Sequence, residues 1–351
     1  SAAKIKGDLA MKFRLDRNIA LAMYRHANRE AMNDVLSLPL ARSAVDRDYL
    51  SRTKPDIFTA LAANPTTKIL PVFDGKVLLT GSANDPQPEL KLFSPQELPT
   101  FNYRAYLGKT IGAQELPDDS AIILQVLDQD AANAIEPNTD NWHVLRRTGA
   151  GLSDLGAGIY AQGLALYNWN KTHGFCPKCG TATELAQAGW VRICPVDKHE
   201  VYPRTDPAII VSVIDDQDRI LLGSQGVWEE NRWSILAGFV EAGESLTAAV
   251  VREIYEEAGV RVVEPTYLAS QAWPFPYSLM LGFTAKVDPR HAKAEPVPDG
   301  DEIEKLRWFS REDIAREAKN LLLPGRMTIS RVMIEHWYGD TIISATEQGL
   351  N

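Results

Sequence analysis

The most constraining feature of this chain is the run Gly238–Val260, in which glycine, aliphatic and charged residues recur at fixed intervals. From about Ser245 the run predicts a helix, because serine caps helix starts and the following apolar residues recur at helical spacing. Gly259 suits the left-handed residue just past the end of such a helix. The run therefore predicts a loop, a helix of about three to four turns and a tight stop.

Three carboxylates lie within about one turn of this helix. Glu253 and Glu257 fall on its apolar, inward stripe, and Glu256 lies close beside them. A buried carboxylate is costly unless it pairs with a cation, and hard ions such as Mg²⁺ prefer carboxylate and phosphate oxygens. The alternative is a solvated acidic face. The position on the apolar stripe favours a metal site, where the ion would bridge substrate phosphates and activate water.

All three cysteines of the chain lie in a second cluster, formed by Cys176, Cys179 and Cys194. With His199 they fit a tetrahedral zinc site of the ribbon type, which is structural because all four positions are filled. Asp197 competes as the fourth ligand and ranks lower, since thiolate and imidazole suit structural zinc better. The alternative is three free thiols, or a disulfide plus one.

The location that we expect is the cytoplasm. The chain has a net charge of −9, no signal peptide and no run of about twenty apolar residues, so no membrane association is predicted. In a reducing cytoplasm, paired thiols usually bind metal.

A third pattern follows the acidic helix in residues 270–278, where two prolines alternate with three aromatic residues. Proline restricts the backbone, so we expect Trp273 and Phe275 to be rigid stacking surfaces for a purine or nicotinamide ring. The alternative is a hydrophobic strand end punctuated by proline.

Together these patterns resemble the Nudix hydrolase family. Nine residues of the first run match its signature, G-x5-E-x7-R-E-U-x-E-E-x-G-U with U an aliphatic residue. The aromatic run resembles the SQPWPFPxS array of the NADH pyrophosphatase branch, with Ala272 where that array has proline. The resemblance to this branch spans about Trp169 to Trp337.

The resemblance implies hydrolysis of NADH, and more slowly of NAD⁺, to AMP and nicotinamide mononucleotide with Mg²⁺ or Mn²⁺. It implies that the catalytic metal is held by Glu253, Glu256, Glu257 and, less directly, Glu302, for which Glu304 competes. Arg252 is expected to brace the loop carboxylate Glu244. The residues that the resemblance places against the substrate are Phe239, Tyr202, Trp273, Phe275, Gln271, Ser278 and Ile329.

The fold class that the resemblance implies is α+β: a Nudix α/β/α sandwich with a mixed sheet, preceded by a zinc ribbon and a β-rich N-terminal domain that helps to build a homodimer. Residues 1–10 precede the first methionine and are expected to be a vector-derived remnant. The expected boundaries are 11–140 for the N-terminal domain, 141–172 for a connecting helix, 173–203 for the ribbon and 204–345 for the Nudix domain. Within the first domain, Asp74-Gly75 predicts a hairpin over residues 69–79, and residues 128–140 predict a polar connection.

Two other functions remain open. One is a regulator that binds a nucleotide without cleaving it, which is expected to have a broken signature and basic residues near the cysteines. The other is a Nudix hydrolase of ADP-ribose, of a diadenosine polyphosphate or of the NAD-like cap on RNA 5′ ends. The net charge of −9 argues against a protein that grips nucleic acid by its phosphates, and the aromatic array favours NADH.

Overall fold

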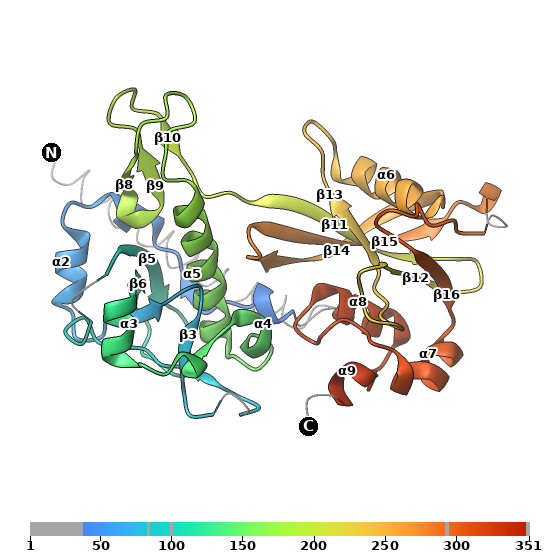
Figure 1. The fold of residues 1–351 in the computed structure, drawn as a ribbon, viewed down its shortest axis with the longest axis horizontal. Helices are drawn as coiled ribbons and strands as arrows, with labels where there is room; N and C mark the ends of the chain where they lie inside the picture. The colour runs from blue at the N-terminus through green and yellow to red at the C-terminus, as the bar shows by residue number, and fades with distance from the viewer. Residues whose placement is uncertain (1–37, 83–84, 99–100, 292–294, 349–351) are drawn as a thin grey trace, which may run out of the picture. The chain divides into compact units, whose positions relative to one another are not determined.

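The computed structural model describes residues 38–82, 85–98, 101–291 and 295–348, which Figure 1 colours along the chain. Residues 1–10, predicted to be a remnant, lie outside this part of the chain. Within the described residues, the search for a helix long and apolar enough to cross a membrane finds none.

The N-terminal domain is built on a four-stranded sheet in the order β1-β5-β6-β2. Its strands are β1 (Val45–Asp46), β2 (Lys68–Val72), β5 (Tyr103–Thr110) and β6 (Ala121–Val126). Every residue of β6 is buried, and β2 runs parallel to it while the other pairs are antiparallel. Buried parallel strands are expected to be largely apolar because both of their faces are covered, and β6 fits this except for the buried Gln125.

A second, three-stranded sheet of this domain has the order β4-β3-β7. Its strands are β3 (Val77–Thr80), β4 (Glu89–Leu90) and β7 (Trp142–His143), and the short helices around both sheets are η1 (Pro39–Ala41), η2 (Tyr49–Thr53), α2 (Ile57–Ala62), α3 (Gln129–Ile135), η3 (Thr139–Asn141) and α4 (Leu145–Thr148). The prediction that residues 128–140 form a plain connection is wrong. Asp128 caps α3 by accepting a hydrogen bond of 2.8 Å from the Ala131 N–H, and the alanines that follow favour helix.

The predicted hairpin over residues 69–79 is only half present. Asp74 and Gly75 both have positive φ and turn the chain, and Phe73 and Lys76 exchange both backbone hydrogen bonds at 2.9 and 3.0 Å. Beyond that pair, β2 and β3 separate into different sheets. The next hydrogen-bonded pair of a hairpin would join residues 71 and 78, and Pro71 has no N–H to donate. The carbonyl of Leu78 accepts from Lys91 instead.

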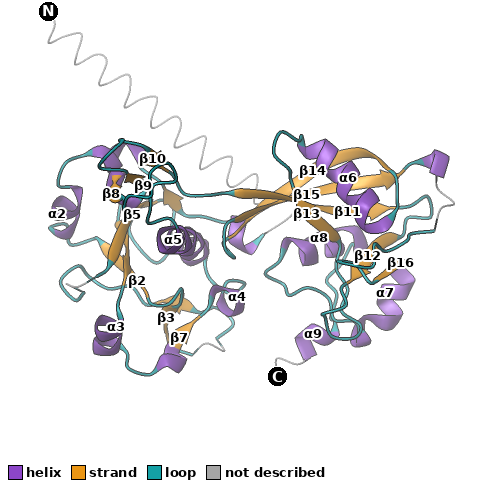
Figure 2. Ribbon diagram, turned by 45° about the horizontal axis from the view of Figure 1, so that its top comes forward, coloured by secondary structure: helices purple, strands orange, loops and turns teal. Residues whose placement is uncertain are grey.

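The helix α5 (Asp154–Thr172), expected as a connection, forms part of the N-terminal core. Ser153 caps it by accepting from the Gly156 N–H at 3.0 Å. Trp169 and Tyr160 are fully buried in the same apolar cluster as the strands of the first sheet. The Tyr160 hydroxyl donates to the carbonyl of Gly75 at 2.9 Å, which ties the helix to the turn described above. Figure 2 shows α5 end-on beside the strands.

The ribbon that follows is a three-stranded antiparallel sheet in the order β10-β9-β8. Its elements are β8 (Glu184–Ala186), η4 (Gln187–Gly189), β9 (Val191–Ile193) and β10 (Glu200–Val201). With so few strands it buries little apolar surface, and a metal site is one of the usual ways in which so small a module is stabilised.

The C-terminal domain contains a six-stranded mixed sheet in the order β14-β15-β11-β12-β16, with β13 also paired to β11. Its strands are β11 (Asp206–Ile214), β12 (Ile220–Ser224), β13 (Leu236–Phe239), β14 (Val262–Trp273), β15 (Ser278–Val287) and β16 (Lys305–Phe309). Its helices are α6 (Leu246–Ala258), η5 (Pro289–His291), α7 (Arg311–Glu317), η6 (Ala318–Asn320), α8 (Ile329–Tyr338) and α9 (Ala345–Gln348). Among the described strand pairs of this sheet, β11 and β15 are parallel and the others are antiparallel.

Helices cover both faces of this sheet (Figure 1). Alternate residues of β11, among them Ile209 and Val211, share a buried cluster with Val250 and Ile254 of α6. On the opposite face, Gly282 of β15 lies directly against Met333 of α8. Because side chains alternate along a strand, one apolar strand supplies both cores. The expected α/β/α sandwich around a mixed sheet is confirmed.

Candidate functional site

The helix α6 is built as its sequence predicts. The Ser245 hydroxyl accepts from the Ala248 N–H at 3.2 Å, and Gly259 ends the helix with φ of 65°. Both caps are local features, so the start and the stop of this helix are encoded in the run itself. They set which turn of the helix carries the carboxylates.

Gly238 allows the closest approach between α6 and the sheet. A Cβ at this position would lie 2.1 Å from the carboxyl carbon of Glu253, so no larger residue fits. Gly238 pairs with Ile209 in the middle of the β11–β13 ladder, and its missing side chain leaves room for the carboxylate over the strand. The glycine that opens the signature thus positions a functional carboxylate.

Arg252 holds together the acidic side chains of the site. It donates two hydrogen bonds to Glu244 at 2.8 and 2.7 Å and one to the carbonyl of Phe239 at 3.0 Å. It also pairs with Glu253 and with Glu256, each at 2.9 Å. The hydrogen bonds from Arg252 lower the pKa of Glu244 to about 2. Arg252 therefore braces the loop carboxylate, as expected, and also fixes two of the three carboxylates of the helix.

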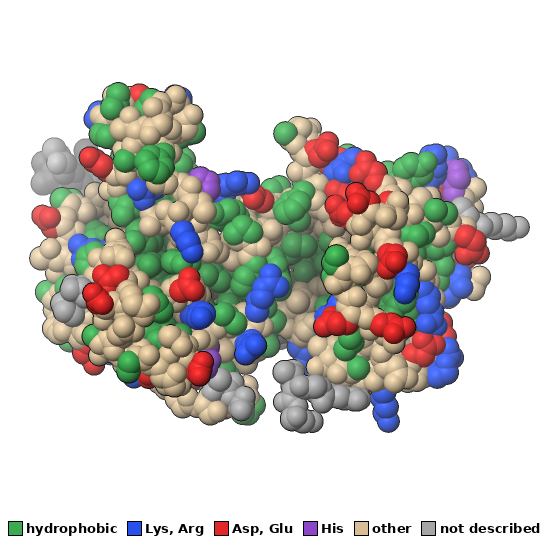
Figure 3. Space-filling view, in the orientation of Figure 1, with side chains coloured by type: hydrophobic (Ala, Val, Ile, Leu, Met, Phe, Trp, Pro, Cys, Tyr) green, Lys and Arg blue, Asp and Glu red, His purple; other side chains and the backbone are tan. Residues whose placement is uncertain are grey.

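Glu257 is the deepest carboxylate of the set. Its side chain is only 5% exposed, and its Oε2 atom is buried with no hydrogen-bond partner. Burial, followed by the charge of Glu253, raises the pKa of Glu257 to about 8. A buried acceptor without a donor is costly, so this oxygen requires a proton or a cation. Figure 3 shows acidic side chains gathered over α6.

The loop before β16 supplies further negative charge. The charge of Glu302 contributes to the raised pKa of both Glu253 and Glu257. Glu304 lies elsewhere: its N–H donates to Ser224 at 2.9 Å, and its carboxylate lies beside Gly226. The geometry thus favours Glu302 over Glu304 as the fourth carboxylate.

These carboxylates fit a divalent cation in chemistry but are not gathered around one point. Among the described residues, the ribbon has a group of potential metal ligands whose atoms all lie within 4.8 Å of one another. The carboxylates of α6 do not form such a group. Arg252 draws Glu253 and Glu256 to itself, whereas the free Glu257 oxygen faces the other acids without a positive partner. Carboxylate oxygens are hard donors that Mg²⁺ and Mn²⁺ prefer, and such an ion would satisfy the buried Oε2 atom of Glu257.

The ribbon brings three thiols and one carboxylate together, and the carboxylate is that of Asp197. The Sγ atoms of Cys179 and Cys194 lie 3.5 Å apart, and the Sγ atom of Cys176 lies 3.6 Å from the nearer oxygen of Asp197. All three cysteines are free, so the alternative of a disulfide is not what the structure shows. This arrangement fits a four-ligand zinc site.

The predicted fourth ligand, His199, lies outside that group. The turn after Cys194 closes with a hydrogen bond of 3.0 Å from the Lys198 N–H, which brings position 197 back toward the thiols. His199 already belongs to the returning chain, where its carbonyl accepts from the Cys194 N–H at 2.9 Å. Its own N–H donates to Asp197 at 2.8 Å. The turn geometry, and not ligand preference, therefore selects Asp197.

The two aromatic residues expected to sandwich a ring are both available. Tyr202 is 57% exposed just after β10, and Phe239 is 60% exposed at the end of β13. The ring contacts between described residues do not include a contact between these two. Phe239 is paired with Ala208 of β11, which places it at the edge of the site beside the Arg252 contact. The structure leaves each ring with an open face.

The proline-rich segment after β14 is docked against the N-terminal domain. Trp273 and Phe275 meet edge to face with centroids 4.9 Å apart, and the Arg146 guanidinium lies 5.1 Å from one ring and 4.2 Å from the other. The side-chain amide of Asn168 on α5 donates to the carbonyl of Pro274 at 2.9 Å. The segment is therefore held by contacts with α4 and α5 as well as by its prolines, and its rigidity stays a prediction.

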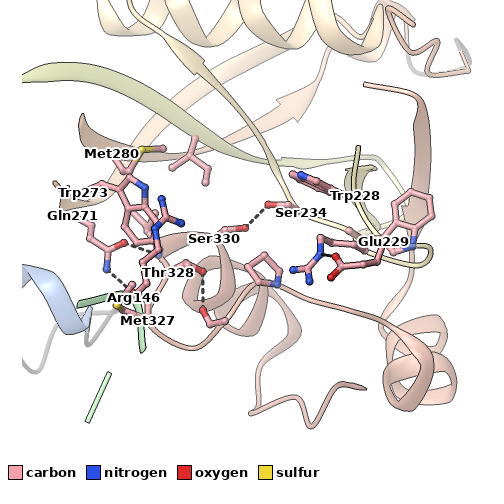
Figure 4. Close-up of a pocket in the computed structure, with 16 residues that line it drawn as sticks. Arg146, Trp228, Glu229, Ser234, Gln271, Trp273, Met280, Met327, Thr328 and Ser330 are labelled. Atoms are coloured by element: carbon pink, nitrogen blue, oxygen red, sulfur yellow. Dashed lines mark hydrogen bonds and ion pairs between the residues drawn. The ribbon is translucent and has the colours of Figure 1, made fainter. Parts of the chain in front are cut away.

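A cavity of about 600 Å³ opens beside this segment (Figure 4). Of the predicted substrate residues it is lined by Gln271, Trp273 and Ile329, and Arg146 and Trp228 complete its ends. Gln271 is fully buried and spans β14 and α8, donating to the Met327 carbonyl at 2.8 Å and accepting from the Ile329 N–H at 2.9 Å. Ser278 pairs with Trp273 across the β14–β15 turn and does not line this cavity.

The cavity and the carboxylates lie on opposite faces of the strands that they share. Ile210 and Met280 line the cavity, and Ile210 pairs with Ala237, two residues from Phe239 on the same face. Gly238, between them, faces α6 and Glu253. Neighbouring residues of a strand point to opposite faces. At the end of β13, the Phe239 ring therefore lies on the cavity side, and Gly238 faces the Glu253 carboxylate of α6 on the other side.

Sequence reasoning missed Arg146, Trp228 and Asn168. Arg146 and Asn168 come from the N-terminal domain, far along the chain from the segment that they contact. No local spacing marks them, because contacts of long sequence separation leave no periodic signal. Trp228, in the loop after β12, carried a usable signal, since a tryptophan within a polar loop is unusual unless it packs or binds.

Comparisons with known proteins cover both the site and the ribbon. Residues 203–328 match the NUDIX domain model, and residues 171–202 match the NADH pyrophosphatase zinc ribbon domain. The chain is 36% identical over 324 residues to a Mycobacterium tuberculosis protein named NAD-capped RNA hydrolase NudC, covering 86% of this chain and 95% of that protein. It is 30% identical over 338 residues to human NAD-capped RNA hydrolase NUDT12, covering 85% of this chain and 72% of that protein.

Among solved structures, a NUDIX hydrolase from Nitrosomonas europaea aligns with a TM-score of 0.38 and 23% identity, over 48% of this chain and 94% of that one. The sequence relatives carry the assignment, because they match the N-terminal domain, the ribbon and the catalytic domain together. The thiol cluster lies in the range that matches the zinc ribbon model, and the capped helix with Gly238 and the braced carboxylates lies in the range that matches the NUDIX model. The chain therefore belongs to the Nudix hydrolase family, in the group that carries the NADH pyrophosphatase zinc ribbon.

Proposed function

We propose that this hydrolase cleaves the pyrophosphate of an NAD unit, releasing the nicotinamide mononucleotide half from the adenosine half. The unit is either free NADH or NAD⁺, or the NAD cap at the 5′ end of an RNA. The curated relatives are named for the capped RNA, and NADH is the substrate that the zinc ribbon's family name suggests. Both substrates present the same bond to the same carboxylates.

The observation that carries this proposal is the free oxygen of Glu257. It is buried within reach of the charges of Glu253 and Glu302, where a pyrophosphate would meet only repulsion without a cation. A site that holds several carboxylates together with an unsatisfied oxygen is suited to a bound Mg²⁺ or Mn²⁺. Glu253, Glu256, Glu257 and Glu302 are the residues that would hold it, and the ion would neutralise phosphate charge and acidify a bound water.

The residues of the chain position this chemistry. Arg252 fixes Glu253 and Glu256 through ion pairs of 2.9 Å and is itself held by Glu244. Because the guanidinium is already fully engaged with three carboxylates and a carbonyl, its role is to orient acids and not to grip phosphate. Burial and the charge of Glu253 raise the pKa of Glu257 to about 8 in the absence of a cation, so binding of a divalent ion would release a proton from this carboxyl.

The cavity provides for the rings. Its volume of about 600 Å³ falls within the range of small-molecule sites, and its walls combine Trp273, Met280 and Ile329 with the cation of Arg146. We place the nicotinamide half here and a second ring at the open face of Phe239. The adenosine half then faces outward, which leaves its 3′ oxygen free to continue into an RNA chain.

A homodimer is part of the proposal. Four large apolar side chains of the ribbon region are exposed: Phe175 at 69%, Leu185 at 43%, Val196 at 70% and Tyr202 at 57%. Figure 3 shows hydrophobic side chains at the surface of this region. Apolar groups gathered at a surface support a partner contact, and size-exclusion chromatography with light scattering tests it. The cytoplasmic location stays a prediction.

The test of the proposed function is a comparison of kcat/KM across NADH, NAD⁺, NAD-capped RNA, ADP-ribose and a diadenosine polyphosphate, each with Mg²⁺ and with Mn²⁺. We expect the NAD-containing substrates to be favoured by at least about tenfold, because only they carry a nicotinamide ring for the cavity. The Glu257→Gln protein is the control for contaminating activity. Equal or higher kcat/KM for ADP-ribose would overturn the ring assignment, and no turnover of any of them would support the non-catalytic regulator.

A further inference from the structure

A second cavity, of about 480 Å³, lies between the N-terminal domain and the ribbon, away from every residue assigned above. Three cationic side chains line it: Arg52 on η2, Lys54 just after η2, and Arg104 on β5. Gln187 and Ala188 of η4 form its ribbon wall, and both hold the left-handed backbone, with φ of 47° and 50°. Backbone of this kind is rare outside glycine and often marks a functional site.

Arg52 is held flat and incompletely satisfied. Its guanidinium lies 3.7 Å from the centre of the Trp190 ring, and its Nη2 atom donates to the Arg47 carbonyl at 3.1 Å. Its Nε atom is buried without a hydrogen-bond partner. A guanidinium stacked on a ring uses its face and keeps its N–H groups along the edge for a planar or anionic ligand.

Arg104 has the same environment. Its guanidinium lies 3.9 Å from the Phe58 ring centre and 4.7 Å from that of Phe101. Within the described residues, Arg104 contacts these two rings and forms no ion pair with a carboxylate. Aromatic faces thus orient two arginines of the cavity without neutralising them.

The acids nearby do not balance these charges. Asp56 lines the cavity and is exposed to solvent. Asp48 acts on Arg52 from outside the cavity, but it already accepts from the Tyr106 hydroxyl at 2.9 Å and pairs with Lys109 at 3.6 Å. Burial, followed by the charge of Arg47, lowers the pKa of Arg52 to about 10, as expected where positive charge is in excess.

We propose that this basic pocket, defined by Arg52, Lys54 and Arg104, binds a phosphate group, and that the phosphate belongs to the backbone of a single-stranded RNA. In a chain with a net charge of −9, a polyanion is held only where cations are concentrated. Tyr49, on the same short helix as Arg52, is 68% exposed and offers a stacking face for a base. The link to catalysis rests on the proposed function, because a capped RNA carries such a backbone beyond the bond to be cleaved.

The test is the affinity of a short, uncapped, fluorescein-labelled single-stranded RNA, measured by anisotropy at several salt concentrations. We expect the double variant Lys54→Gln/Arg104→Gln to raise Kd about tenfold at low salt and to reduce the salt slope by about one to two. The matched control is Arg290→Gln/Lys319→Gln, which removes the same charge from exposed cations elsewhere. Its Kd should change less than about twofold, because no pocket is lost. Equal weakening in both double variants would overturn the pocket.

Arg52→Gln serves as a second variant, with thermal unfolding measured alongside, since Arg52 also stacks on Trp190. Inorganic phosphate, added at matched ionic strength, tests whether the pocket binds free phosphate instead of the phosphates of an RNA backbone. Protection of the wild type by inorganic phosphate without RNA binding would overturn the assignment to RNA. Turnover of free NADH should be unchanged in Lys54→Gln/Arg104→Gln. A chain that hydrolyses neither free NADH nor capped RNA yet binds uncapped RNA through these residues would overturn the proposed function and leave the pocket intact.

Discussion

The ribbon and the helix α6 both gather negatively charged ligands, but they relieve the repulsion in different ways. In the ribbon, three thiols and the Asp197 carboxylate converge within 4.8 Å, which only a metal ion can neutralise fully. On α6, Arg252 draws Glu253 and Glu256 aside and leaves Glu257 buried and unsatisfied. The four ribbon ligands would close around one ion, whereas in the acidic site Arg252 already occupies two of the carboxylates and an ion would have to compete with it.

This difference separates folding from chemistry. A module as small as the ribbon has little core of its own, so metal binding and folding are coupled there. The helix α6 packs on a large sheet core and keeps its fold through those apolar contacts. Removing a ribbon ligand should therefore damage the protein, and removing an α6 carboxylate should damage only its activity.

The largest expected effect is in the ribbon. Structural zinc sites contribute on the order of 10 kcal/mol to folding of their module, so Cys179→Ser should give an unstable or aggregating protein. Metal analysis of the wild type should find about one zinc per chain. Asp197→Ala should lower zinc retention more than His199→Ala, because Asp197 lies with the thiols. A zinc-free chain that is fully folded and active would remove the contrast between the two sites.

The next effect is on catalysis. Glu257→Gln and Glu253→Gln keep the shape of the side chain and remove a metal-binding charge, so each should lower kcat at least about a hundredfold, or ~2.7 kcal/mol of barrier. Thermal unfolding should change little. Glu244→Gln is the control, with a smaller loss because it acts through Arg252. Turnover near that of the wild type at saturating Mg²⁺ in both variants would show that the metal lies elsewhere.

Gly238→Ala tests the approach of α6 to the sheet. The added Cβ would lie 2.1 Å from the Glu253 carboxyl carbon and must displace that carboxylate. Misplacing a catalytic group by about 1 Å can cost up to about a hundredfold in rate, and we expect kcat to fall accordingly. Gly174→Ala is the matched control, because its Cβ would meet open space. An unchanged kcat in Gly238→Ala would mean that the position of Glu253 is not critical.

Phe239→Ala separates ring binding from metal binding. Stacking contributes ~1 to 3 kcal/mol per base in nucleic-acid contacts, so kcat/KM for NADH should fall roughly five- to a hundredfold. The loss should be much smaller on a pyrophosphate substrate that lacks the stacked ring. Equal losses on both substrates would show that Phe239 supports the Arg252 contact through its carbonyl and does not read the ring.

The last prediction concerns the pH dependence of stability. Folding raises the pKa of Glu257 from the ordinary 4.5 to about 8, so the folded chain retains a proton that the unfolded chain has lost. Without divalent cations, stability should therefore fall as pH rises through that window, by up to about 1.4 kcal/mol per pH unit. Unfolding of the wild type and of Glu257→Gln at several pH values measures the difference. Parallel pH profiles would show that the carboxyl is already paired.

Local signals explain which parts could be predicted from the sequence. The caps at Ser245 and Gly259 lie within the run that they delimit, and the apolar stripe fixes the side on which Glu257 is buried. The hairpin over residues 69–79 failed because one residue, Pro71, lacks the donor that the second hydrogen-bonded pair needs. Turn signals are local, but pairing beyond the turn depends on both strands.

Ligand geometry and distant contacts explain the rest. The spacing allowed either Asp197 or His199 as the fourth zinc ligand. Chemical preference favoured His199, whereas the turn after Cys194 brings Asp197 to the thiols. The contacts of Arg146 and Asn168 with the proline-rich segment join two domains, and no spacing predicts them. The proline-rich segment could be predicted to be rigid, but not to be held from outside.

The helix α5 links the ribbon to the proline-rich segment. Near its end, Asn168 donates to the Pro274 carbonyl at 2.9 Å, and two residues later Asn170 accepts from Arg192 of β9. A ribbon that has lost its metal would therefore loosen the segment that shapes the ring cavity, while the carboxylates on α6 stay in place. In a partly zinc-depleted sample, the chains that have lost zinc should first bind NADH more weakly and then aggregate, so the active fraction of the sample should follow its zinc content.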